Sequence, residues 1–121
     1  MNFKIDTKEK MHVITVEQPD LAANMTEELE KELTFYLSAP IKNLVINLEN
    51  VKLIDEGIAR TLVNIQQDFY DANNSLVFCK LRPEVENYLE SIELLEIMNV
   101  TPTVSEASDI VQMEEIEREF L

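Results

Sequence analysis

Runs of apolar residues divide the chain into segments typical of strands. Residues 3–7 and 11–17 predict two strands of an opening hairpin, because β-branched side chains concentrate in the second. Residues 41–48 and 76–81 are almost continuously apolar, which is typical of strands buried on both faces of a sheet. Residues 99–101 predict a short final strand.

Apolar positions at helical spacing predict helices between and after these strands. Asn24 with Glu27 indicates a capping box that begins a first helix, which we expect to end at about residue 37. The later helices begin after a turn at residues 55–57, at Pro83, and at a second capping-box pattern, Thr103 with Glu106. The predicted order is β-β-α-β-α-β-α-β-α in a single α/β domain over residues 1–121, with an acidic last helix from about residue 104.

Charge and composition narrow the possible partners. The net charge of -14 opposes binding to nucleic acid or to anionic membranes. No run of about 18 apolar residues occurs, so we expect a cytoplasmic protein with no direct membrane insertion. Residues 83–121 hold eleven acidic residues and one basic residue, Arg118, a net charge of -10. Solvated helix faces explain this excess more simply than a site for a basic partner.

Few residues in the chain could support catalysis. Cys79 lies in an apolar run, which favours a buried thiol over a reactive one, and the lone histidine, His12, has no nucleophile near it in sequence. Asp55 and Glu56 could approach Mg²⁺, but no third ligand is evident, and a receiver domain would need an acidic pair and a late lysine that are missing. We therefore expect no enzyme, no catalytic residue, no metal and no cofactor, and an enzyme using these two carboxylates remains only a formal alternative.

Gly57 is the only glycine in the chain, and it stands between a strand-like and a helix-like run. Glycine permits a positive φ or a close approach of a partner to the backbone, and the amides that open the following helix can face an anion. The alternative is a tight turn without a function.

Three segments carry a resemblance to a known family. Residues 44–48, followed by residues 51–55, and the later residues 77–83 resemble the STAS domain of bacterial anti-sigma-factor antagonists, and the resemblance covers almost the whole chain. It implies a mixed central sheet of about five strands backed by about four helices. It also implies a non-catalytic protein-interaction module.

The family's phosphorylation motif is altered in this chain. Relatives carry an Asp-Ser-[Ser/Thr]-Gly-like motif at the start of the second helix, and a kinase phosphorylates the residue two positions after the aspartate. That position is Gly57 here, while Glu56 replaces the first serine and Ile58 the following glycine. A one-residue deletion could instead pair Gly57 with the family glycine, which also removes the acceptor. Ala22 replaces the aspartate usual in the turn before the first helix.

Two regulatory consequences follow from the resemblance. The chain could act as a permanently unphosphorylated antagonist, or Glu56 could imitate the phosphorylated state; the first is favoured because one carboxylate is a poor copy of a dianion. Thr61, one turn after Gly57, is a candidate displaced acceptor, although an ordinary helix residue is the simpler interpretation.

The resemblance also suggests the partner and its binding surface. An anti-sigma factor or a related serine kinase would bind the turn, the exposed face of the second helix and the loop before the first helix, and the chain itself would be a monomer or homodimer. The candidate contact residues are Asp55, Glu56, Gly57, Arg60, Thr61, Ala22 and Asn24, with Gln66 and Gln67 on the same helix. The alternative function is a STAS scaffold or transport-accessory subunit that acts through self-assembly or a membrane complex.

Overall fold

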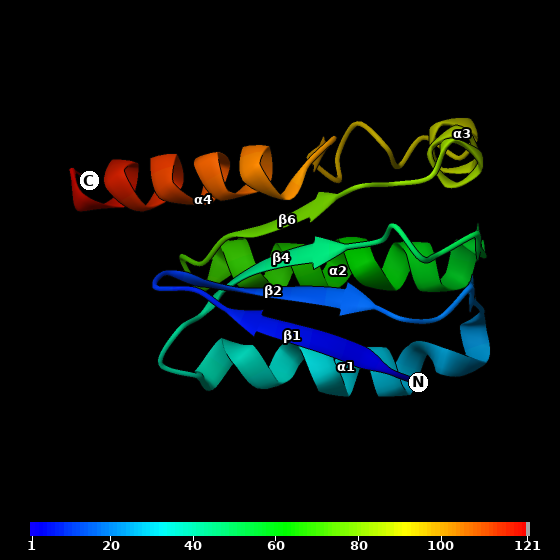
Figure 1. Cartoon of the computed structure of the whole chain (residues 1–121), viewed down its shortest axis with the longest axis horizontal. Helices are drawn as coiled ribbons and strands as arrows, with labels where there is room; N and C mark the ends of the chain where they lie inside the picture. Colours follow the sequence, from blue (N-terminus) through cyan, green and yellow to red (C-terminus); the bar gives the residue numbers. More distant parts are fainter. Residues whose placement is uncertain (121) are drawn as a thin grey trace.

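The computed structural model describes residues 1–120, which form a five-stranded mixed sheet with helices packed against it (Figure 1). The elements in chain order are β1 (Phe3–Thr7), β2 (Met11–Val16), β3 (Asp20–Leu21), the 3-10 turn η1 (Ala23–Met25), α1 (Thr26–Thr34), the 3-10 turn η2 (Phe35–Ser38), β4 (Asn43–Asn47), β5 (Leu53–Ile54), α2 (Glu56–Asp71), β6 (Leu76–Cys79), α3 (Pro83–Ser91), β7 (Val100–Thr101) and α4 (Val104–Glu119). The expected α/β fold is confirmed.

The strands of the main sheet lie in the order β1-β2-β4-β6-β7. β1 pairs antiparallel with β2, and the remaining neighbours pair parallel, so the carboxyl ends of β2, β4 and β6 meet at one edge. A second sheet of two short parallel strands, β3 and β5, was not expected from the sequence. Its second strand, β5, ends just before α2, so the sheet positions the start of that helix.

Two apolar clusters cover the two faces of the sheet. The larger one joins α1, α2 and α3 to the sheet, and Phe69 of α2 and Phe78 of β6 are fully buried in it. The smaller one joins the sheet to α4, through residues such as Ala107 and Val111. Cys79 belongs to this second cluster, and burial raises the pKa of its thiol to about 11. The prediction of a buried thiol is confirmed.

The two predicted capping boxes have different outcomes. The prediction that Asn24 caps the first helix is wrong: Asn24 lies inside η1, and α1 begins after Met25 and ends at Thr34. Asn24 belongs to η1 because this turn packs against the start of α2, where the Ala23 N–H donates to Asp55 Oδ2. Thr103 does cap α4, since its side-chain oxygen accepts a hydrogen bond of 3.1 Å from the Glu106 N–H.

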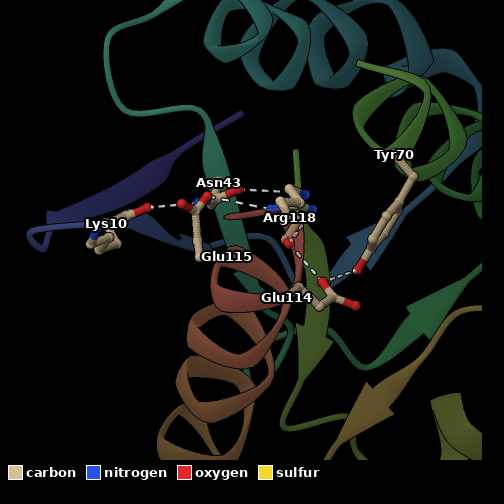
Figure 2. Close-up of polar contacts among 7 residues, drawn as sticks. Lys10, Asn43, Tyr70, Glu114, Glu115 and Arg118 are labelled. Carbon is tan, nitrogen blue, oxygen red and sulfur yellow. Dashed lines mark hydrogen bonds and ion pairs between the residues drawn. The ribbon is translucent and has the colours of Figure 1, made fainter. Parts of the chain in front are cut away.

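A polar cluster fastens the C-terminal half of α4 to the amino ends of β4 and β6 (Figure 2). The buried Asn43 amide donates to Glu115 Oε1 at 2.7 Å and to the Lys10 carbonyl at 3.0 Å, and its oxygen accepts from the Ser75 N–H at 2.8 Å. Arg118 donates to Ser75 Oγ at 2.8 Å and to Glu115 Oε1 at 3.3 Å. These bonds satisfy polar groups that the docking of α4 removes from water.

Glu114 of α4 links this cluster to Tyr70 of α2. Its Oε1 accepts from the Tyr70 hydroxyl at 2.8 Å and from Ser75 Oγ at 2.6 Å. Burial, followed by the hydrogen bond and charge of Glu114, raises the pKa of Tyr70 to about 12. The phenol therefore remains a donor across the neutral pH range, and the last helix is docked along its C-terminal half.

Candidate functional site

Asp55 organises the turn that the sequence singled out. It is the N-cap of α2, and its Oδ1 accepts from the Ile58 N–H at 2.9 Å. Its Oδ2 accepts from the Ala23 N–H at 2.6 Å, across 32 positions of sequence. Both carboxylate oxygens are therefore engaged within the chain, so Asp55 holds two segments of the surface together.

Gly57 is the second residue of α2 and is exposed. Of the two properties that a glycine permits here, a positive φ is not used, because Gly57 has the backbone of the helix it belongs to. A Cβ at this position would lie 3.4 Å from the Cβ of Ala23 and 3.6 Å from Asp55 Oδ1, so the close approach is made by the chain's own η1 turn. Both distances are ordinary van der Waals contacts, so the position has room for a small side chain.

The first turn of α2 presents a charged pair beside Gly57. Arg60 Nε donates to Glu56 Oε2 at 2.9 Å, and both side chains are more than half exposed. Such an exposed pair contributes little to stability. Thr61 lies one turn on, is half-buried, and its hydroxyl donates to the Gly57 carbonyl at 3.1 Å.

The loop before α1 lies against this helix start. Asn24 is exposed and Ala22 half-buried, and the Ala22 carbonyl accepts from the Met25 N–H at 2.9 Å to close the η1 turn. The bond between Ala23 and Asp55 places this turn beside the start of α2. The structure thus brings the candidate residues of the two segments together.

Leu53 is a surface residue that sequence reasoning missed. It lies on β5, two positions before Asp55, and its side chain is 63% exposed. The neighbouring Ile54 is buried, as strand alternation requires. We call Asn24, Leu53, Glu56, Gly57 and Arg60 the turn surface.

Of the two glutamines predicted to lie on the exposed face of α2, one does not. Gln66 is buried, and its amide donates to the Leu76 carbonyl at 3.1 Å and to the Met98 carbonyl at 2.6 Å. It satisfies backbone acceptors that the packing of the chain before β7 would otherwise leave unpaired. Gln67 is exposed and donates to Asp71 Oδ1 at 2.9 Å.

The turn surface combines apolar and charged side chains. Across residues 1–120, no group of three or more histidine, cysteine, aspartate or glutamate side chains is placed to hold a metal ion. His12, the single histidine, lies 2.9 Å from Thr7 Oγ1 and packs on the Tyr36 ring, at a centroid distance of 4.7 Å. In the same part of the chain, no helix is long and apolar enough to cross a membrane.

Solved structures with the same fold include regulators and a transporter. An anti-sigma factor antagonist from Mycobacterium paratuberculosis has a TM-score of 0.78 and 14% identity, covering 92% of this chain and 93% of that one. A serine-to-glutamate variant of RsbS from Moorella thermoacetica has a TM-score of 0.76 and 20% identity, covering 98% and 99%. The mouse anion transporter Slc26a9 has a TM-score of 0.71 and 14% identity, covering 86% of this chain and 18% of the transporter.

Sequence comparison leads to the same fold. No curated protein matches the chain. Residues 2–107 match the family model described as the STAS domain, and these residues include both segments of the turn surface. The chain therefore belongs to the STAS domain family.

Proposed function

We propose that this protein is a non-catalytic interaction module that resembles an anti-sigma-factor antagonist. It docks an anti-sigma factor or a serine-kinase-like protein through the turn surface and the exposed face of α2. Membership of the STAS family and the fold shared with anti-sigma-factor antagonists support a protein-interaction role. The exposed Leu53 beside a charged pair supports this location, because contact surfaces combine an apolar centre with a polar rim.

The observation that carries the proposal is Gly57 at the exposed second position of α2. A hydroxyl at a helix start could accept a phosphate, which adds about -1.5 to -2 charge units and is stabilised there by the helix amides. Glycine has no such hydroxyl. The turn surface therefore binds its partner without phosphate control at this position.

The pairing of Glu56 supports the same regulatory state. Its carboxylate is paired with Arg60 at 2.9 Å, so a cation of the chain itself offsets the charge of Glu56. This arrangement favours a surface that resembles the unphosphorylated state over one that imitates a phosphate. Thr61 supports it too, since the residue is half-buried and its hydroxyl donates to the Gly57 carbonyl of the helix backbone.

Affinity capture from the native extract tests the docking surface. We expect the wild-type protein to capture a kinase-like or sigma-regulating protein, and Leu53→Arg to lower that capture about tenfold or more by placing a charge in the contact. Phe35→Arg is the matched control, because Phe35 is 64% exposed and Leu53 63%, and Phe35 lies in η2 at the other end of α1.

Two outcomes would contradict the proposal. One is no such protein at saturating bait, and the other is equal capture by Leu53→Arg and wild type. Recovery of a membrane transporter through the same surface would favour the alternative function, a transport-accessory subunit. That alternative is supported by the fold shared with a segment of the mouse anion transporter.

Gly57→Ser should restore a phosphate acceptor. With the captured kinase and ATP, we expect this variant to gain one phosphate, about 80 Da by intact mass, and then to lose partner binding. The variant should fold, since Gly57 has no positive φ and a Cβ there meets only contacts of 3.4 Å or more. Gly57→Ala controls for the added carbon and should gain no phosphate. Phosphorylation of the wild-type protein at Thr61 would contradict the absence of phosphate control.

A further inference from the structure

α4 carries a second apolar face that points away from the sheet. Ala107 and Val111 pack on the sheet, whereas Met113, Ile116 and Phe120 are 52%, 55% and 82% exposed. The spacing of these three residues, i, i+3 and i+7, places them in one stripe along the helix and its C-cap. We call them the α4 stripe. Solvent-exposed apolar side chains in a line, unlike scattered ones, indicate a contact surface.

Carboxylates surround the α4 stripe. Asp109 and Glu106 continue its line toward the start of the helix, and Glu117 and Glu119 flank it, all four exposed. Arg118, the one basic residue of Val104–Glu119, is turned the other way and is bound to Ser75 and Glu115. The exposed face of α4 is therefore apolar along its middle and acidic along its sides.

A groove of about 540 Å³ lies on one side of the α4 stripe, between α4 and the hairpin that joins β1 and β2. Ile116, Gln112 and Glu119 line it from α4, and Met11, Lys8 and Lys10 line it from the hairpin. Lys8 is paired with Asp6 at 3.0 Å. The groove gives a ligand helix a place to seat apolar side chains next to Ile116.

We propose that the α4 stripe binds a basic amphipathic helix of a partner protein. Apolar anchors at i, i+3 and i+7 suit a helix that lays its apolar side along them, and lysines or arginines beside that side would meet the flanking carboxylates. A second copy of this chain fits poorly. It would bring the carboxylates of two α4 helices together, and each chain carries a net charge of -14.

This binding site is separate from the turn surface. α4 covers one face of the sheet, and α1 and α2 pack on the other. In Figure 1 the C-terminal end of α4 lies at the left, while β4 and β6 point to the right, toward the edge where α3 begins. The two surfaces therefore share no residue.

A synthetic helical peptide of about 18 residues, with a leucine stripe flanked by lysines, tests this inference. With isotope-labelled full-length protein, we expect the peptide to shift the amide NMR signals of α4 from Asp109 to Phe120. The same peptide with glutamate in place of lysine should not bind. Raising the salt concentration should weaken the lysine peptide, because screening reduces the charge attraction.

Variants separate specific docking from general attraction to an acidic protein. Replacing Met113, Ile116 and Phe120 together by serine leaves the charge unchanged and should weaken peptide binding about tenfold or more. Serine in place of Ile5, Phe35 and Ile97, which are also exposed apolar residues and lie outside both proposed binding surfaces, is the matched control and should leave the affinity unchanged. Circular dichroism verifies that both variants are folded.

Each remaining outcome overturns the proposal. These are the absence of binding, equal affinity of the wild type and the stripe variant, shifts centred on the start of α2, and a dimer in light scattering that the stripe variant abolishes. The last result would assign the α4 stripe to a second copy of the chain. None of these results depends on whether the turn surface binds a kinase-like protein.

Discussion

Replacing Asn43 by alanine is expected to lower the free energy of unfolding by about 3 kcal/mol, because it removes three hydrogen bonds and leaves buried partners unpaired. The Asn43 side chain joins the Lys10 carbonyl, the Ser75 N–H and Glu115, so it ties the hairpin, β6 and α4 to the start of β4. The Ser75 N–H is buried and would have to find water after the substitution. No other residue described above joins as many elements through one side chain.

Denaturant unfolding measures this effect. We expect a lower midpoint with an unchanged slope, since the same surface is exposed on unfolding. Asn64→Ala is the matched control at an exposed position of α2, and it should stay within about 0.5 kcal/mol of the wild type. A loss below about 1 kcal/mol for Asn43→Ala would mean that the surrounding groups find other partners.

Replacing Asp55 by alanine is expected to cost about 2 to 3 kcal/mol, of which about 1 kcal/mol is the lost N-cap of α2. The remainder comes from the charge-assisted bond of 2.6 Å that Asp55 accepts from the Ala23 N–H. The second loss also frees the η1 turn from the start of α2. Partner capture through the turn surface should therefore fall even at temperatures where the variant is folded.

Asp55→Asn separates the contribution of the N-cap bond from that of the bond with Ala23. Its oxygen can still accept from the Ile58 N–H, but its amide nitrogen cannot accept from Ala23, so we expect roughly half the loss of Asp55→Ala. Thermal unfolding provides the comparison, and Asp68→Ala on the exposed face of α2 is the control. If Asp55→Ala were as stable as the wild type, the role given to both bonds would be wrong.

The main strands and helices could be predicted from the sequence because each has a strong apolar period or run. Residues 41–48 and 76–81 contain β4 and β6 with small errors at their ends. β3 and β5 were missed since two residues show no period. The start of α1 was misplaced because Asn24 fits a helix cap and a 3-10 turn equally well, and tertiary contact with Asp55 decided between them.

The placement of the candidate residues was predicted only in part. Gly57 lies at the exposed start of α2, yet its helical φ follows from the Asp55 cap, which sequence reasoning did not assign. Gln66 seemed to belong to the polar face, but its partners are backbone carbonyls far along the chain. The cluster around Asn43 includes a hydrogen bond between residues 72 positions apart, Asn43 and Glu115, and such pairings leave no local pattern.

The bond between Ala23 and Asp55 makes the turn surface a property of the folded chain. Its two segments lie 32 residues apart, so an unfolded chain does not display them together. A ligand that recognises both segments must therefore raise the melting temperature, by an amount set by its concentration relative to its dissociation constant. Binding of such a ligand therefore also reports whether the chain is folded. A chain that has lost the bond between Ala23 and Asp55 presents the two segments apart, and the ligand can contact only one of them.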